Sequence, residues 1–489
     1  MHWIDLSIFV LYILAMLGIG YYFLNKNEGA DDYYVGGRNM SSSHIGLSVV
    51  ATDVGGGFSI GLGGLGFVIG ISGSWMLFTG LLGAWLAAVF LIPKVKGNKV
   101  FDTAYTFPDI FKHYFNGRVA LIAGIISAIG YTGFTSSQIL AGAKLAHGTY
   151  AELDLYTALI IMGTIAVAYT VMGGLKAVVY TDTLQWGFLM FGLIFIGLPV
   201  SYTAIGGWEA ITDTVDPELL SMTNITWQQV VYWGVSIIPI WFVGMTLYQR
   251  IYACPDEKTA KRAWYLAGLF EWPVMAFMGT LLGLFAKVAA AQGMFDYLGV
   301  QSITEADPET GLPMLLRTVL PVGLLGLMMS AYFSAILSTA DSCLMASSGN
   351  VVNDIVGYFK NIDHDSSSFM RFSQIVTLLI GVVSIALASV MTNVLNLMLY
   401  SYSFMVSGLF VPVIGAFYWK KSSSTGAMAA MILGGGTTVC LEAFVNQLPA
   451  GLDANVFGIT ISALAFVTLS LLFPDESKTP AAEYSGAAS

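Results

Sequence analysis

The sequence predicts an all-helical membrane protein with about thirteen transmembrane helices. Of its 489 residues, 56% are hydrophobic and only 10% are charged, whereas a soluble domain carries about 25% charged residues. The mean hydropathy of +0.74 is typical of chains whose side chains face lipid. Apolar stretches long enough to cross a bilayer, about 20 residues each, recur along the chain. Glycine or proline interrupts two of these stretches, as in many transporters.

Thirteen stretches meet the length and hydropathy that a span requires. They cover residues 4–23, 44–70, 73–95, 119–147, 154–173, 179–199, 229–250, 264–290, 313–345, 371–391, 393–419, 424–444 and 454–473. We therefore expect a single transmembrane transporter domain over residues 1–473, followed by a disordered cytoplasmic tail over residues 474–489.

Lysine and arginine in the loops predict the orientation of the chain. With the N-terminus outside, seventeen of the 20 Lys and Arg residues, Arg250 among them, fall on the cytoplasmic side. Only Lys144, Lys287 and Arg317 fall outside. The sequence thus predicts a multi-pass protein of the cell membrane, with its N-terminus outside and its C-terminus in the cytoplasm.

Several classes of function are disfavoured by what the chain contains. It has no basic patch suited to nucleic acid, and its three cysteines are too scattered for a disulfide framework or a metal knuckle. The five histidines are scattered too, so we expect no enzyme. The expected partners are a small-molecule solute and the lipid bilayer, with no nucleic acid and no obligate protein partner.

Two predicted spans carry helix-breaking residues. The second, "SVVATDVGGGFSIGLGGLGF", has three consecutive glycines after Asp53, and the seventh has Pro239 in its middle. An unwound turn frees carbonyl groups that can bind a cation, although the glycines could instead serve close helix packing. The two breaks lie five spans apart, which predicts two inverted repeats over residues 44–199 and 229–419. Residues 4–23 and 424–473 would then be extra helices.

The ninth span contains the polar stretch "SAILSTADSC". On a helix, its hydroxyl and carboxyl side chains fall on one stripe, made of Ser334, Ala335, Ser338, Asp341 and Ser342, with Thr339 at its edge. Hydroxyls facing free carbonyls can replace the hydration shell of Na⁺. The alternative is that the hydroxyls bond back to their own helix.

These motifs, together with "ADDYYVGGR", "GGLKAVVYTDTLQ" and the Gln-Arg pair of "LYQRIYA", resemble the sodium:solute symporter family. The resemblance runs from about residue 4 to 473 and implies the broken-helix fold first seen in LeuT. It argues against a channel. In local motifs the chain is most similar to the proline and choline branches.

The resemblance also implies a cofactor, Na⁺, at one site and possibly at two. The first sodium site would use the hydroxyls of Ser338 and Thr339 and the carbonyls of Ala51, Val54 and Ala335. A second would use Asp182 with Ser338, Asp341 and Ser342. Asp182 could instead cap the start of the sixth span, and Asp341 departs from members that have Ser there.

The solute is expected near the midplane, between the broken helices. The candidate side chains are Asp53, Phe58, Phe134, Thr135, Gln138, Trp241, Tyr248, Tyr402 and Phe404. By this resemblance, the position that matches Asp53 holds an aromatic residue in the choline branch, an amide in the sugar branch and Asp in the proline branch.

A carboxylate at this depth favours a positively charged group, so the leading hypothesis is symport of an amine-bearing solute such as proline or a choline-like amine. The competing hypotheses are a sodium/sugar symporter using Gln138 and Tyr402, a sodium/monocarboxylate symporter, and a sensor without coupled transport. Glu271, in the eighth span, is expected to be structural: it would pair within the bundle or lie near the cytoplasmic interface, about two turns from Arg262.

Overall fold

The computed structural model describes residues 2–24, 30–150, 152–299, 307–362 and 367–475. Throughout these ranges the regular structure is helical, which confirms the predicted fold class. Eleven helices in the described ranges are long and apolar enough to cross a membrane, or twelve if one bent pair is counted as a span.

Twenty-one α-helices follow one another in the described part of the chain. The first half contains α1 (Trp3–Leu24), α2 (Ala30–Val35), α3 (Ser42–Ile69), α4 (Trp75–Leu86), α5 (Ile92–Val95), α6 (Pro108–Tyr114), α7 (Gly117–Thr149), α8 (Leu155–Gly192), α9 (Leu198–Ala204), α10 (Gly207–Thr214) and α11 (Trp227–Val243). The second half contains α12 (Met245–Ala253), α13 (Glu257–Leu269), α14 (Ala276–Ala291), α15 (Pro308–Val319), α16 (Leu324–Gly349), α17 (Gly357–Phe359), α18 (Ser367–Ala388), α19 (Val394–Tyr418), α20 (Ser424–Phe444) and α21 (Ala454–Leu472).

The span count differs from the expected thirteen partly because helices run into one another. The stretch 55–95 is continuous by length and hydropathy, yet it takes in parts of two expected spans, since α3 ends at Ile69 and α4 begins at Trp75 after a tight turn.

The expected span over 313–345 was wrong. Pro321 and Gly323 separate α15 from α16, and Asp5 of α1 accepts the amide hydrogens of Gly323 and Gly326 at 2.7 and 2.9 Å, so that α16 begins there with its amides satisfied.

The predicted break in the second span is confirmed, because α3 has non-helical backbone at Gly55. The seventh span is also broken, but not at Pro239, which stays inside α11. The proline leaves the carbonyl of Val235 without its helical partner, and Asn455 of α21 donates to that carbonyl at 3.2 Å. The chain unwinds instead at Gly244, where α11 and α12 meet at a bend of 41°.

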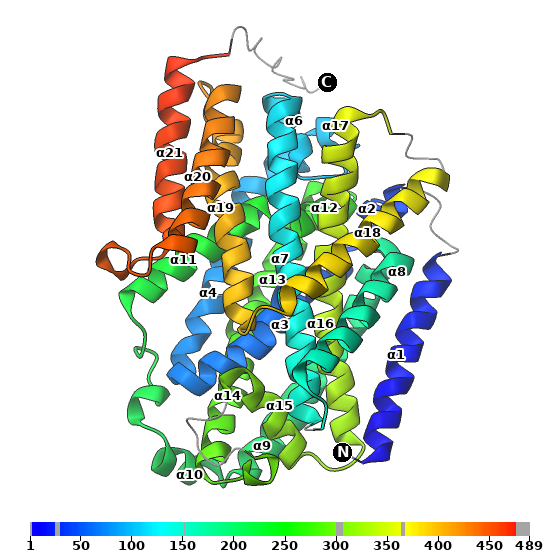
Figure 1. The fold of residues 1–489 in the computed structure, drawn as a ribbon, viewed down its shortest axis with the longest axis vertical. Helices are drawn as coiled ribbons and strands as arrows, with labels where there is room; N and C mark the ends of the chain where they lie inside the picture. Colours follow the sequence, from blue (N-terminus) through cyan, green and yellow to red (C-terminus); the bar gives the residue numbers. More distant parts are fainter. Residues whose placement is uncertain (1, 25–29, 151, 300–306, 363–366, 476–489) are drawn as a thin grey trace.

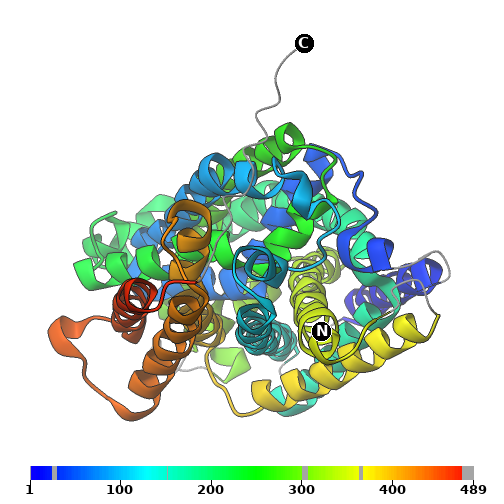
Figure 2. The ribbon, with the colours of Figure 1, turned by 90° about the horizontal axis from the view of Figure 1, so that it is seen from above.

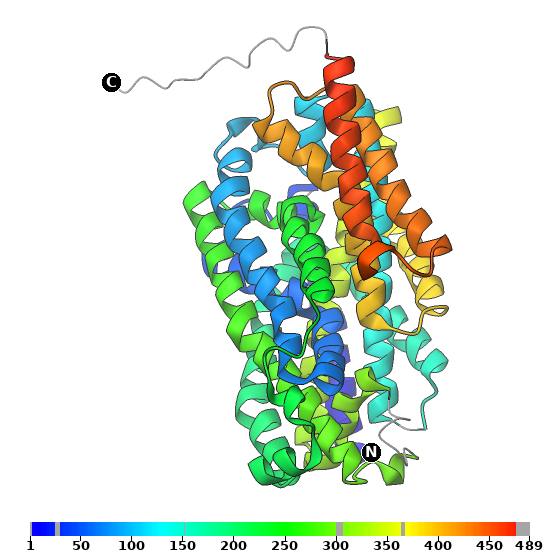
Figure 3. The same ribbon diagram turned by 90° about the vertical axis from the view of Figure 1, so that its left-hand side faces the viewer.

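The bundle has a centre and two flanks. Looking down the long axis, α7 and α16 lie in the middle, α1 lies at one edge, and α20 and α21 lie at the opposite edge (Figure 2). On the face that Figure 3 presents, α4 and α11 pack side by side. The described ends of the chain lie at opposite ends of the long axis (Figure 1). Helix α3 contacts α7, α8, α13, α14, α15, α16 and α19, so its break lies at the centre.

At the end of the bundle where the N-terminus lies, one buried carboxylate joins three helices. Glu309 of α15 accepts the amide hydrogens of Val394 and Leu395, the first residues of α19, at 3.0 Å each. The ammonium of Lys144 in α7 lies 2.7 Å from Glu309 and 2.7 Å from Asp307. Lys144 was expected to be a loop charge, but only 3% of its side chain is exposed, because α15 covers it.

Candidate functional site

The break in α3 is held by two neighbouring helices. The amide of Gly56 donates to the side-chain oxygen of Gln138 in α7 at 2.7 Å, which satisfies a donor that the break would leave free. A Cβ atom at Gly55 would collide with the hydroxyl of Thr339 in α16. Both roles that the sequence allowed for the glycines are therefore observed. They let the backbone unwind, and they let α7 and α16 approach it closely.

The residues predicted for the first sodium site meet at this break. The hydroxyl of Thr339 donates to the carbonyl of Ala51 at 3.0 Å and to that of Ala335 at 3.3 Å. The hydroxyl of Ser338 is buried and has no hydrogen-bond partner in the described part of the chain. Val54 immediately precedes the non-helical Gly55. Neutral oxygens gathered around an unsatisfied hydroxyl suit a hard monovalent cation.

The second predicted site has a different character. Asp182 lies inside α8, eight residues after a kink at Gly174, so it is not the helix cap that the sequence allowed. Its Oδ2 accepts the hydroxyl of Ser48 at 2.5 Å and lies 3.4 Å from Arg250. Its Oδ1 has no hydrogen-bond partner among the described residues. Asp341 accepts the hydroxyl of Thr170 at 2.5 Å.

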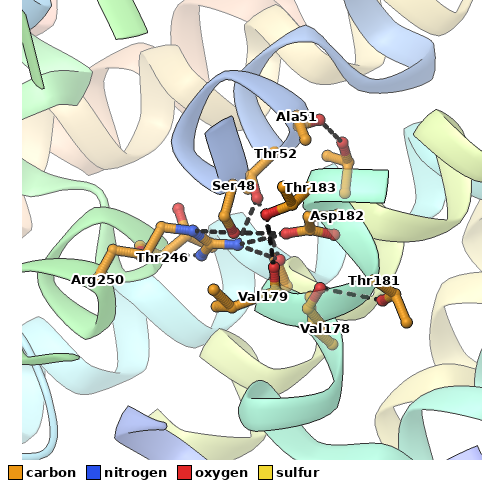
Figure 4. A network of polar contacts seen from close by, with 12 residues as sticks. Ser48, Ala51, Thr52, Val178, Val179, Thr181, Asp182, Thr183, Thr246 and Arg250 are labelled. Carbon is orange, nitrogen blue, oxygen red and sulfur yellow. Dashed lines mark hydrogen bonds and ion pairs between the residues drawn. The ribbon is translucent and has the colours of Figure 1, made fainter. Parts of the chain in front are cut away.

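Arg250 is the cation at this second site (Figure 4). Its guanidinium is fully buried, which corrects its expected place among the cytoplasmic loop charges. It donates to Thr52 at 2.5 Å, to Ser342 at 2.8 Å and to Ser48 at 3.0 Å, and its remaining nitrogen donates to the carbonyl of Thr246. These bonds tie α12 to α3, α8 and α16, and they neutralise a carboxylate that would be costly to bury alone.

The predicted solute residues separate into two groups. Asp53, Phe134 and Tyr402 gather beside the break: the Phe134 and Tyr402 rings pack edge to face with centroids 5.0 Å apart, and the Tyr402 hydroxyl interacts with the Asp53 carboxyl. One oxygen of Asp53 lacks a hydrogen-bond partner within the described ranges.

The other candidates make structural contacts. The hydroxyl of Thr135 donates to a carbonyl of its own helix, and the hydroxyl of Tyr248 donates across the second break to the carbonyl of Phe242. The Trp241 ring lies against Gly83 and Trp264. The Phe404 ring lies against Gly435 of α20. Gln138 is engaged with Gly56 and Ser137. The side chain of Phe58 falls outside the described residues.

Three polar groups at the centre escaped the sequence analysis as site residues. Arg250 follows an apolar run and so resembles a residue at a membrane boundary. The hydroxyl of Tyr131, in α7, shares a hydrogen bond with the hydroxyl of Thr246 and accepts the amide hydrogen of Thr246. It thereby caps the start of α12. Glu271 lies in a π-helical turn, Phe270–Met275, fully buried and facing Asp53. Its only signal was a carboxylate before Trp-Pro inside an apolar span.

Comparison with known proteins agrees with this architecture. A sequence model of the sodium:solute symporter family matches residues 33–434. The osmoregulated proline transporter OpuE of Bacillus subtilis is 26% identical over 479 residues, which cover 94% of this chain and 93% of that protein. The sodium/proline symporter of Escherichia coli is 25% identical over 476 residues, covering 95% and 92%.

A solved structure of a Na⁺-coupled sialic acid symporter, in a substrate-bound outward-open state, superimposes with a TM-score of 0.78 at 20% identity, covering 96% of this chain and 98% of that one. This likeness establishes the LeuT-like fold. The family match spans most of the chain and includes both broken helices and the polar stripe of α16. The chain therefore belongs to the sodium:solute symporter family and is a sodium-coupled secondary transporter rather than an enzyme.

Proposed function

We propose that this protein imports a small amine-bearing solute, an amino acid such as proline or a choline-like amine, together with sodium. The observation that carries the proposal is Asp53, a buried carboxylate in α3 just before the break, with an oxygen that has no hydrogen-bond partner in the described residues. Such a group is stable at membrane depth when a positive charge faces it. The names of the curated relatives, which are proline transporters, support the amine class.

Sodium would bind at the break, held by the carbonyls of Ala51, Val54 and Ala335 and the hydroxyls of Ser338 and Thr339. A bound ion supplies a positive charge that bridges α3 and α16. The residues around it then fix the relative position of the two helices and with it the position of Asp53. Release of the ion loosens this contact, and the bundle can rock to expose the site to the other side.

The double substitution Ser338→Ala and Thr339→Ala removes both hydroxyl ligands. We expect the sodium concentration for half-maximal solute uptake to rise at least about tenfold, equivalent to about 1.4 kcal/mol. Uptake into proteoliposomes over a series of sodium concentrations measures this. Ser330→Ala is the matched control, because its hydroxyl donates back to the carbonyl of Gly326 in the same helix, away from the break. A double variant with the parent protein's sodium dependence would refute the assigned site.

We also propose that one sodium ion accompanies each solute. At the second predicted site, Arg250 already binds Ser342 and neutralises Asp182, and Thr170 bonds to Asp341. The hydroxyl of Ser338 and one oxygen of Asp182 are the groups with no partner there among the described residues. Two such groups are fewer than the five oxygens assigned to the first site, and Ser338 is already one of those five.

The ratio of ions to solute follows from a balance of gradients. With the membrane potential clamped at zero, a tenfold sodium gradient should hold about a tenfold solute gradient, since each tenfold ratio is worth about 1.4 kcal/mol. Proteoliposomes with preset gradients show the point at which net solute flux vanishes. A balance near a hundredfold solute gradient would mean two ions and would exclude the single-site proposal.

Asp53→Asn keeps the shape of the side chain and removes its charge. If the solute carries a positive group, sodium-dependent binding should weaken at least about tenfold, because the partner charge is lost. A neutral sugar would bind nearly as before. Isothermal titration with the purified protein separates these outcomes, and Glu442→Gln, an exposed carboxylate change on α20, is the control. Unchanged affinity for both solute and sodium would contradict the amine proposal.

We propose, finally, that the N-terminus lies outside the cell and the C-terminus inside. The loop Lys and Arg residues support this: without the buried Arg250 and Lys144 the bias toward the cytoplasmic side remains.

In a variant with all three native cysteines replaced, Gln447→Cys should react with a membrane-impermeant maleimide in intact cells, whereas Lys421→Cys should react only after lysis. Both residues are exposed and flank α20 on opposite ends. The reverse labelling pattern would invert the topology.

A further inference from the structure

A cavity lies among α1, the end of α7, the first turns of α8 and the end of α15. Its volume of about 630 Å³ falls within the range of roughly 300–1,000 Å³ that is usual for small-molecule sites. No described residue of α3 or α16 lines it. The cavity is therefore separate from the break in α3 and from the proposed sodium and solute sites.

The apolar part of the cavity lies between α1 and α8 and opens toward the bilayer. Leu6 and Val10 of α1 and Ile161 of α8 line it, and these side chains are 47, 44 and 45% exposed. Phe9 of α1 and Met162 of α8 line it as well, but both are buried. The exposed side chains thus form the rim of an apolar groove, and the buried ones form its inner wall.

The wall that α1 contributes is attached to the rest of the bundle. Asp5 accepts the amide hydrogens of Gly323 and Gly326, and the hydroxyl of Tyr12 shares a hydrogen bond of 2.8 Å with that of Ser334 in α16. Both contacts join α1 to the start or the middle of α16. The space between α1 and α8 is therefore a feature of the packed bundle and not the result of a loosely attached helix.

Polar groups line the other end of the cavity. Tyr150 is the C-cap residue of α7, Glu152 lies in the connection to α8, and Arg317 lies in the last turn of α15. Because α7 and α8 cross the membrane, the connection between them lies at the level of the lipid headgroups. From Leu6 to Ile13, the wall of α1 extends about 10 Å along its axis. The cavity thus changes from polar to apolar with depth, as an amphiphile does.

The charge of Arg317 is not neutralised by any carboxylate in the described ranges. None of the ion pairs there includes it. Its Nη1 is buried without a hydrogen-bond partner among these residues, and its guanidinium lies 5.7 Å from the centre of the Tyr297 ring. The hydroxyl of Tyr150 also has no partner within the described part of the chain. A guanidinium and a hydroxyl at the polar end of an apolar groove suit a phosphate group.

Glu152 restricts the kind of phosphate headgroup that is complementary to this end. Its side chain is exposed and lines the same cavity as Arg317. A headgroup whose only charge is negative would meet Glu152 as a like charge. A headgroup that carries an ammonium group beyond its phosphate brings an opposite charge to each of the two residues.

We propose that this cavity binds one phospholipid with an ammonium-bearing headgroup, such as phosphatidylethanolamine. An acyl chain lies between α1 and α8, the phosphate is bound by Arg317 and Tyr150, and the ammonium group faces Glu152. The lipid contacts α1, α8 and α15 together, so its binding stabilises the folded protein. The site does not depend on which solute the protein carries.

The purified full-length protein, stripped of lipid in detergent, is titrated with dioleoyl phosphatidylethanolamine and separately with dioleoyl phosphatidylglycerol. We expect the melting temperature to rise and saturate with both lipids. Phosphatidylethanolamine should reach half-saturation at a concentration at least about fivefold lower, because Glu152 disfavours the purely anionic headgroup. Native mass spectrometry should show one retained phosphatidylethanolamine per protein. Equal or tighter binding of phosphatidylglycerol would overturn the assigned headgroup.

Two charge variants test the polar end. Arg317→Gln should weaken phosphatidylethanolamine binding at least about fivefold, because the phosphate loses its charged partner. Lys287→Gln is the matched control, since its ammonium also lies over an aromatic ring, that of Phe67 at 5.8 Å, but does not line the cavity. Glu152→Gln should abolish the preference between the two lipids. Unchanged binding by folded Arg317→Gln would overturn the proposal.

The apolar end is tested without any change of charge. Ile161→Trp fills the groove with a larger side chain and should abolish retention of the lipid. Ile160→Trp is the control, because Ile160 is 40% exposed on the same helix and does not line the cavity. Equal retention by the two tryptophan variants would contradict the assigned groove. Non-saturating retention of several lipids, the same in the parent protein and in Arg317→Gln, would mean bulk bilayer lipid only and would overturn the site.

Discussion

The buried guanidinium of Arg250 is the contact on which the inner part of the structure depends. A single side chain binds Ser48 and Thr52 of α3, Asp182 of α8 and Ser342 of α16. Removal of one partner from a buried ion pair typically costs about 3–5 kcal/mol, because the other charge is left unpaired. The half of α3 that precedes the break and the helix α12 that follows the second break are thus held to the same point. Any movement of one must be accommodated by the other.

The cation chemistry at the centre comes mainly from the backbone. A helix normally consumes its own carbonyls, and α3 can offer those of Ala51 and Val54 only because it unwinds at Gly55. The cost of that break is offset by side chains that replace the lost helical bonds: Gln138 at Gly56, and Tyr131 at the start of α12. The polar residues of α7 thus stabilise both broken helices within an apolar bundle.

Local patterns predicted the all-helical class, the break at the three glycines and the stripe of Ser338 and Thr339, because helix period, hydropathy and glycine act over a few residues. Long-range partners decided the rest. Pro239 does not break its helix, because Asn455, more than two hundred residues away, satisfies the freed carbonyl. Arg250 and Lys144 resembled loop charges, and only tertiary contacts with Asp182 and Glu309 bury them. Glu271 comes close to Asp53 because α3 packs against the turn after α13, and no periodicity in the sequence predicts that packing.

The junction of Lys144, Glu309 and the first amides of α19 has a thermodynamic consequence for the end of the bundle at which the N-terminus lies. Both side chains are almost completely dehydrated, so the attraction between them is largely cancelled by the hydration that each gave up. If α15 lifts away from α7 and α19, water returns to both charges and repays most of the loss. These contacts therefore fix the relative positions of α7, α15 and α19 closely while contributing little to the free energy of folding. Contacts of this kind are specific in geometry and weak in free energy, so α15 can separate from α7 and α19 at a small cost.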